Sequence, residues 1–169
     1  MSASDADFDR WRAALLAMPV SRVWRGHGSA LFLELGALLP GGRRRDGSAG
    51  GPQGLFTVMI EWSWRIEDDT TVHCGSWSGE HLWPDAFAAL EGRRIEDVSL
   101  FGRPAELRIA LTGGRRVLSF MTAEGDPAWT IFDASAGRHR PRAIGVDGGV
   151  LREEQATPEA GSSRETQGR

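Results

Sequence analysis

The segment LFTVMIEWSWRI, residues 55–66, carries the clearest secondary-structure signal in this chain of 169 residues. Every even position in it holds a large apolar residue: Phe56, Val58, Ile60, Trp62, Trp64 and Ile66. The odd positions become polar toward its end, at Glu61, Ser63 and Arg65. Because the side chains of a β-strand alternate between its two faces, the segment predicts a strand with one buried face and one partly wet face.

Further strands are predicted on both sides of this segment. The residues EDDT turn the chain, and TVHCGSW, residues 71–77, returns as a hairpin partner. Alternating or β-rich runs predict the other strands, around Val23–Trp24 and over residues 31–35, 95–101, 105–111, 115–121 and 128–132. This pattern is typical of a sheet built mostly from antiparallel strands.

Two helices are predicted in addition. In residues 5–18 the apolar side chains recur at helical spacing on one face, and Ser4 or Asp5 can cap the N-terminus. We expect that face to cover the core. A short central helix begins at Pro84, a residue favoured in the first turn, and ends at Gly92. The predicted fold is therefore α+β, with an N-terminal helix, a short central helix and either a curled sheet or two packed sheets.

The domain boundaries follow from composition. Residues 1–150 are expected to form one domain, and the tail 151–169, poor in apolar residues, is expected to be disordered. The glycine- and arginine-rich segment 40–54 is expected to be a mobile loop. Two stretches share an alternating strand, a Gly-Gly-Arg turn, a second strand and a Trp-x-Ile motif. A duplicated β unit and chance similarity both explain this likeness, and the sequence leaves the two open.

The motifs GHGSALFLELG, EWSWRIE, CGSWS and the long segment from LFGRPAELRIAL to AWTIF, within residues 22–133, resemble small bacterial α+β domain families of unknown function. Some of those families are suspected immunity proteins encoded beside toxins. The resemblance implies a domain shape and the interaction role of such proteins. It implies no active-site residues, because none of these motifs is a catalytic signature.

Composition excludes several classes of protein. The net charge of −3 argues against a domain that mainly binds nucleic acid, which needs a cationic excess. No segment approaches the roughly 20 apolar residues that span a bilayer, so no membrane association is expected. The single cysteine excludes an internal disulfide. With no signal-peptide core recognised, a cytoplasmic location is expected.

The segment HCGSWSGEHLW, residues 73–83, concentrates the residues able to do chemistry. Its spacing matches no standard metal motif, and one cysteine is too few for a cysteine-rich zinc site, so no metal and no cofactor are expected. Cys74 on a strand faces away from His73, which argues against a thiolate–imidazole pair. We expect Cys74 to be a small buried side chain and assign no catalytic residue.

The register of the hairpin decides the environment of His73. A two-residue loop would place His73 opposite Trp64, on the buried face, and a three-residue loop would place it opposite Arg65, with Cys74 against Trp64. We favour the second register, because it leaves the polar atoms of histidine and arginine accessible to water.

A surface for a partner or ligand is the remaining candidate site. It comprises aromatic and charged residues near the Gly-Ser-Gly bend and the hairpin: Trp77, Glu80, His81, Trp83, Arg65 and His73. Trp83 alternatively serves only to anchor the helix that starts at Pro84. Three classes of function follow: a non-catalytic protein-interaction module, immunity-like in its narrower form; a small-ligand-binding domain with a pocket near Trp77 and Trp83; and an enzyme using Cys74 or a histidine-centred metal. The first, with another protein as partner, is favoured.

Overall fold

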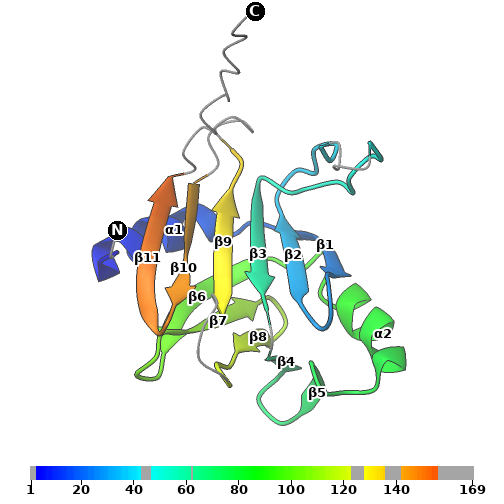
Figure 1. Ribbon diagram of the computed structural model, residues 1–169. Coiled ribbons are helices and arrows are strands. Elements are labelled where there is room, and N and C mark those ends of the chain that lie inside the picture. The colour runs from blue at the N-terminus through cyan, green and yellow to red at the C-terminus, as the bar shows by residue number, and fades with distance from the viewer. Residues whose placement is uncertain (1–2, 43–46, 62, 123–127, 136–141, 156–169) are drawn as a thin grey trace, which may run out of the picture.

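The computed structural model describes residues 3–42, 47–61, 63–122, 128–135 and 142–155. Within these ranges, eleven strands form two antiparallel sheets, one of six strands and one of five. Figure 1 shows how the two sheets are arranged. The first sheet has the order β1-β2-β3-β9-β10-β11, made by Val20–Arg25, Leu31–Leu35, Phe56–Ile60, Trp129–Asp133, Arg142–Asp147 and Val150–Gln155. The second has the order β5-β4-β8-β7-β6, made by Val72–Gly75, Trp64–Glu67, Arg115–Ser119, Glu106–Leu111 and Ile95–Phe101. The predicted α+β class is confirmed, in its two-sheet form.

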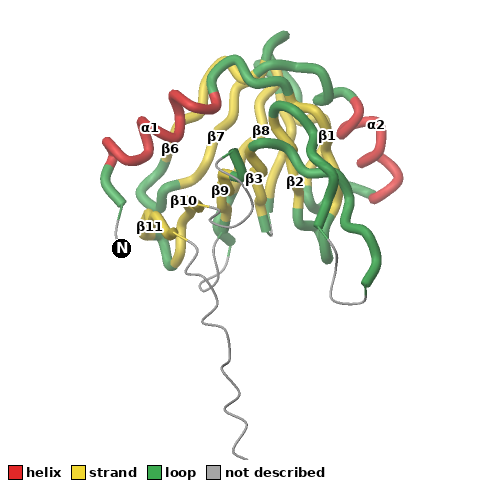
Figure 2. Tube along the Cα trace, turned by 90° about the horizontal axis from the view of Figure 1, so that it is seen from above, coloured by secondary structure: helices red, strands yellow, loops and turns green. Residues whose placement is uncertain are grey.

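Two α-helices lie at opposite flanks of the sheets, as Figure 2 shows. Helix α1, Asp5–Leu15, begins at Ser4, whose side chain accepts from the Asp7 N–H in a capping box. Its buried residues are Phe8, Trp11 and Leu15, so the predicted core-facing stripe is confirmed. The helix ends three residues earlier than predicted. Helix α2, Trp83–Ala88, follows the short 3₁₀ helix η1, Glu80–Leu82, and is also shorter than predicted.

The single strand predicted over residues 55–66 is wrong. The chain forms β3 in the first sheet, leaves it after Ile60, and enters the second sheet as β4 at Trp64. The alternation nevertheless continues across the bend, because Ile60, Trp64 and Ile66 all enter the common core. The inner faces of the two sheets pack against each other, so one apolar alternation of period two buries side chains of both β3 and β4. Trp62 lies outside the described residues.

One segment boundary also differs from the predictions. Residues 151–155, expected in the disordered tail, belong to β11, whose residues pair along their whole length with β10. The expected tail beyond them lies outside the described residues. In the glycine-rich segment, Leu39 and Gln53 exchange backbone hydrogen bonds of 2.7 and 2.9 Å, which ties the two ends of the loop together. Its arginines, residues 43–45, lie outside the described residues, so the expected mobility stays a prediction.

The two halves of the chain have the same arrangement. In the first half, helix α1 precedes β1-β2-β3 in one sheet and β4-β5 in the other. In the second half, helix α2 precedes β6-β7-β8 in one sheet and β9-β10 in the other. Each helix contacts the first strand of the opposite half, α1 on β6 and α2 on β1. This is the pattern that an approximate twofold rotation exchanging the sheets produces.

Matched hydrogen bonds support the twofold relation. Val20 accepts from the Gly92 N–H, and Ile95 accepts from the Ala17 N–H, both at 2.8 Å. An isolated bridge between Pro19 and Arg94 lies between these two bonds in the chain. Strands β1 and β6 carry their irregularities at the same step, Val20/Arg22 and Ile95/Asp97.

The Trp-x-Ile motifs also match. Trp64 Nε1 donates to the carbonyl of Ser29 at 2.6 Å, and Trp129 Nε1 donates to the carbonyl of Ala105 at 2.8 Å. Each acceptor lies two residues before an equivalent position of the second strand of its half, Leu31 in one half and Leu107 in the other. We infer that the repeat left open by the sequence is a duplicated structural unit.

Candidate functional site

The residues of the predicted surface do not form one rim. The structure distributes them over three places: the turn after β5, the groove between β1 and α2, and the outer side of the β4–β5 hairpin. Glu80 and Trp83 come together in the groove. Trp77 lies apart at the tip of the turn, and Arg65 and His73 belong to the hairpin.

Trp77 is 90% exposed, the highest exposure among the large hydrophobic residues of the described chain. Its turn is closed by hydrogen bonds on both sides. The Gly75 N–H donates to the Ser78 hydroxyl at 2.9 Å, and the Ser78 N–H donates to the Gly75 carbonyl at 3.0 Å. The Ser76 N–H donates to the Trp64 carbonyl at 2.9 Å. The backbone around Trp77 is therefore held in place while its indole ring points into solvent.

Trp83, six residues later, is only 5% exposed. Its ring makes an edge-to-face contact with Trp64 at 5.8 Å and lies near Phe87 at 6.3 Å. The anchoring role considered for Trp83 is therefore confirmed, because its ring fixes the start of α2 against the core. Its buried Nε1 has no hydrogen-bond partner among the described residues, and such an unpaired donor is uncommon in a folded protein.

A groove of about 400 Å³ lies beside Trp83, between β1 and α2. The guanidinium of Arg25 covers the Trp83 ring at 4.8 Å and pairs with the Glu80 carboxylate at 2.7 Å. The Arg25 guanidinium makes both the cation–π contact and the ion pair, and the two contacts together hold it along the wall of the groove. Trp77 does not line this groove. The pocket expected near both tryptophans is therefore present only at Trp83.

The predicted register of the β4–β5 hairpin is wrong. Arg65 lies opposite Gly75, and Cys74 lies opposite Ile66, which is a shift of two residues from the favoured register. One residue comes from the irregularity between Ile66 and Glu67, and the other from a loop of four residues, instead of three, between Glu67 and its partner Val72. Cys74 is buried and His73 is not, as expected, whereas Val72, which the favoured register would bury beside Cys74, is 56% exposed. Burial is the main cause that raises the pKa of the Cys74 thiol, which disfavours the reactive thiolate.

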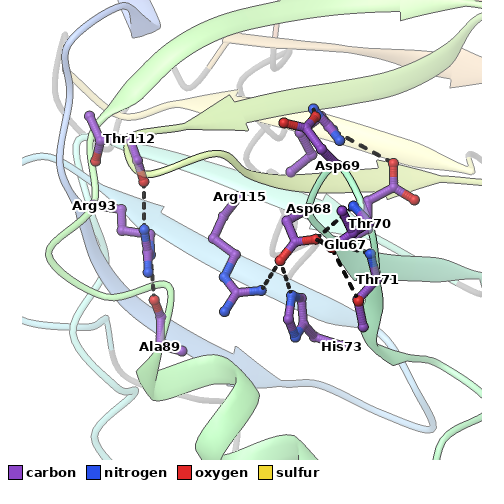
Figure 3. A network of polar contacts seen from close by, with 11 residues as sticks. Glu67, Asp68, Asp69, Thr70, Thr71, His73, Ala89, Arg93, Thr112 and Arg115 are labelled. Atoms are coloured by element: carbon purple, nitrogen blue, oxygen red, sulfur yellow. Dashed lines mark hydrogen bonds and ion pairs between the residues drawn. The ribbon is translucent and has the colours of Figure 1, made fainter.

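His73 belongs to a polar network that closes the hairpin turn, shown in Figure 3. Its Nε2 lies 2.6 Å from Asp68 Oδ2, and Arg115 contacts the same oxygen at 3.3 Å. The other oxygen of Asp68 accepts from the backbone N–H groups of Thr70 and Thr71, both at 2.9 Å. The Thr70 N–H is the largest cause that lowers the pKa of Asp68. These contacts join Asp68 to three later residues of the same hairpin, Thr70, Thr71 and His73, so the arrangement stabilises the turn.

Arg65 and His81 complete the set. The guanidinium of Arg65 lies over the Phe120 ring at 4.6 Å and pairs with Glu67 at 2.5 Å, on the outer face of the second sheet. His81 is exposed on η1. A Cβ at Gly79 would lie 2.7 Å from its ring, so the ring would have to move if residue 79 carried a side chain. Neither residue reaches the groove.

No group of three or more His, Cys, Asp or Glu side chains in the described part of the chain is placed to bind a metal ion. No helix among those residues is long and apolar enough to cross a membrane.

Sequence reasoning missed Arg25, which contributes both the cation–π contact and the ion pair of the groove. Arg25 precedes Glu80 by 55 residues, and nothing in the local pattern of either segment connects them. The sequence offered only the presence of an arginine and an acid as a signal, and with 20 arginines and 23 acidic residues in the chain this signal does not single out Arg25. Comparison with protein-family models, curated proteins and solved structures found no match for the chain.

Proposed function

We propose that this chain is a non-catalytic protein-interaction domain whose contact surface is centred on Trp77. The observation that carries the proposal is an almost fully exposed tryptophan on a turn held by its own hydrogen bonds. Burying a large aromatic ring in a partner's pocket supplies much of the binding energy of a typical interface. Ordering a flexible loop would reduce that gain, and the closed turn lowers this cost.

Neighbouring residues fit the periphery of such a surface. Leu82 and Val72 are exposed apolar residues on η1 and β5, the elements that flank the turn. Glu80 and Arg25 add an exposed ion pair beside them. An apolar centre with charged neighbours is the usual composition of a protein interface. The narrower form of the proposal, an immunity-type role with a toxin as partner, rests on the resemblance of the sequence motifs.

Strand addition at β5 is not part of this proposal. β5 is an edge strand of the second sheet. Both backbone groups of Gly75 on its free side are occupied by Ser78. The irregularity at Ile66/Glu67 further disrupts the row of groups that an added strand needs. The side chain of Trp77, and not the edge of the sheet, is therefore the proposed contact.

The experiment is a partner capture followed by a measured affinity. A protein that co-purifies with the wild-type chain from its own lysate is expressed alone, and its Kd for wild type and Trp77→Ala is measured by calorimetry. We expect the variant to bind at least about thirtyfold more weakly, the effect of losing roughly 2 kcal/mol at a central aromatic contact. Leu38→Ala, at an exposed leucine of another loop, is the matched control and should bind normally. Equal affinities of wild type and Trp77→Ala would refute the proposal.

A small-ligand role is the second candidate, supported by the groove beside Trp83 and by the unpartnered Nε1 of that residue. A ligand acceptor within reach of that nitrogen would satisfy it. Saturable quenching of tryptophan fluorescence by a compound, lost in Arg25→Ala and retained in Trp77→Ala, would favour this role over the first. The enzyme alternative gains no support from the buried Cys74 thiol.

A further inference from the structure

The outer face of the six-stranded sheet carries a second hollow, far in sequence from Trp77. It has a volume of about 400 Å³ and is lined by residues of β1, β2, β3, β9 and the loop before β3. Those that carry the argument are Trp24, Phe32, Glu34, Gln53, Thr57 and Phe132. We call this hollow the aromatic groove. An outer sheet face normally carries solvated polar residues, so three aromatic rings there need a reason.

The second half of the chain shows that the fold does not require these rings. The cross-strand pair Trp24–Phe32 of β1 and β2 corresponds to Ser99–Arg108 of β6 and β7. Its rings stack at 4.1 Å, whereas the Arg108 Nε donates to the Ser99 hydroxyl at 3.0 Å. The same structural position is thus filled by a polar pair elsewhere in the same molecule.

The remaining positions of the groove differ in the same way. The pair Thr57–Phe132 of β3 and β9 corresponds to Arg116–Glu67 of β8 and β4, which form an ion pair at 3.6 Å. Glu34 corresponds to Ala110. The six-stranded sheet therefore carries an aromatic and acidic set where the five-stranded sheet carries ordinary surface residues.

The loop over the groove also exists in one half only. Residues 36–55 connect β2 to β3, whereas residues 112–114 alone connect β7 to β8. Gly42 and Gln53 of the long loop line the groove. The Gly54 N–H donates to Glu34 at 2.8 Å, which attaches the end of the loop to the sheet. Long loops kept in compact domains are commonly functional.

The chemistry of the wall selects the charge of the ligand. Glu34 has no exposed surface, and its carboxylate accepts from Trp24 Nε1 at 2.8 Å and from the Thr57 hydroxyl at 2.6 Å, besides Gly54. These three donors already make hydrogen bonds to Glu34, so they are not available to bind an anion. Among the described residues, no arginine or histidine pairs with Glu34. The groove thus combines aromatic rings with a carboxylate that pairs with no cation among the described residues, and this combination attracts a cationic ligand.

Arg22 provides an example within the protein. Its guanidinium lies over the Trp24 ring at 5.4 Å and donates to the Pro52 carbonyl at 3.2 Å. A cationic side chain therefore already binds one wall of this region, beside the aromatic groove. We propose that the aromatic groove binds an organic cation, an alkylammonium group that comes either from a free amine or from a lysine side chain of a partner.

The first test compares three probes of one shape by calorimetry: choline, its neutral analogue 3,3-dimethylbutan-1-ol, and the anion 3,3-dimethylbutanoate. We expect choline to bind at least about fivefold more tightly than the alcohol, the effect of a cation–π contact near 1 kcal/mol. Nα-acetyl-lysine methylamide is a fourth probe, and whichever of it and choline binds more tightly identifies the source of the ammonium. Equal binding of alcohol and choline, tighter binding of the anion, or no saturable choline binding overturns the proposal.

The second test locates the site. Phe132→Ala leaves the three hydrogen bonds of Glu34 in place, and we expect it to weaken choline binding at least about fivefold. Phe120→Ala, at a phenylalanine under Arg65 on the other sheet, is the matched control and should bind choline as wild type does. The double variant Trp24→Ser/Phe32→Arg installs the residues of the second half and should abolish binding. Unchanged affinity in Phe132→Ala would overturn the assignment.

A third measurement does not depend on the folding of any variant. In wild type, choline should shift the NMR signal of the Trp24 indole N–H, which is hydrogen-bonded to Glu34. That signal is identified by its absence in Trp24→Phe. A choline-dependent shift confined to the other indoles would overturn the proposal even if every variant were unstable.

Discussion

Ala17 and Gly92 occupy equivalent positions after the two helices, and both have a positive φ, 64° and 81°. Ala17 is the only residue other than glycine with this conformation in the described chain. A side chain with a Cβ in this region costs about 1–2 kcal/mol, whereas glycine adopts it freely. The twofold relation therefore predicts that Ala17 is strained and that Gly92 marks the residue type the position favours.

We expect Ala17→Gly to stabilise the protein. The substitution removes about 1–2 kcal/mol of backbone strain and adds conformational freedom to the unfolded chain, which costs about 0.4–1 kcal/mol. The net gain is about 0.5–1 kcal/mol. Gly92→Ala should destabilise by a similar amount. No heavy atom lies within 4 Å of a Cβ at residue 92, so the effect there comes from the backbone alone.

The assay is urea unfolding followed by tryptophan fluorescence, with thermal unfolding beside it. A change of 1 kcal/mol should move the Tm by about 2–4 °C in a domain of this size. Ala14→Gly is the matched control, at an exposed position of α1, and should cost about 1 kcal/mol. The same Ala-to-Gly change then has opposite signs at positions 14 and 17. Destabilisation of Ala17→Gly by as much as Ala14→Gly would refute the reasoning, as would a neutral Gly92→Ala.

The other predictions concern single side chains. Glu34→Ala should lower the unfolding free energy by about 2–4 kcal/mol, since it leaves three donors unpaired; a loss below 1 kcal/mol, with wild-type m-value, would contradict this. Hydrogen bonds from its N-terminal cap lower the pKa of Asp7 to about 2, so its stabilisation is present above pH 4 and lost as the pH falls toward 2. The destabilisation in Asp7→Asn should accordingly be measurable at pH 6 and vanish near pH 2, and an equal effect at both would count against it. Cys74 should react with a thiol reagent only after unfolding, and rapid stoichiometric labelling of the native protein would show otherwise. Trp83→Ala should cost about 3–5 kcal/mol, while Trp77→Ala should change stability by less than about 0.5 kcal/mol.

Local patterns predicted the features that depend on neighbours in the chain. The core-facing stripe of α1 and its Ser4 cap follow from spacing and from one side chain that accepts a nearby N–H. The alternation that buries Ile60, Trp64 and Ile66 follows from the geometry of a strand. Such signals are short-range, and the structure preserved them.

The same patterns could not show where a strand changes sheet. Alternation continues from Ile60 to Trp64 because both inner faces meet one core, so its period contains no mark of the bend. The register of Cys74 and His73 depended on the length of the loop after Glu67 and on one extra residue in β5, which no composition rule reveals. The two similar motifs were visible in the sequence, and the hydrogen bonds that match between the two halves became visible only in the structure.

Trp77 and Trp83 show what the sequence determined and what the tertiary structure alone decided. The sequence by itself determined that Trp77 and Trp83 flank a bend before a helix. Their spacing left open which ring is buried. The tertiary structure decided it, because α2 packs on β1 and carries Trp83 against Trp64, while the closed turn directs Trp77 away from both sheets. Burial depends on which surfaces meet in space, and the partner of Trp83 comes from a strand far enough away that no local pattern relates the two.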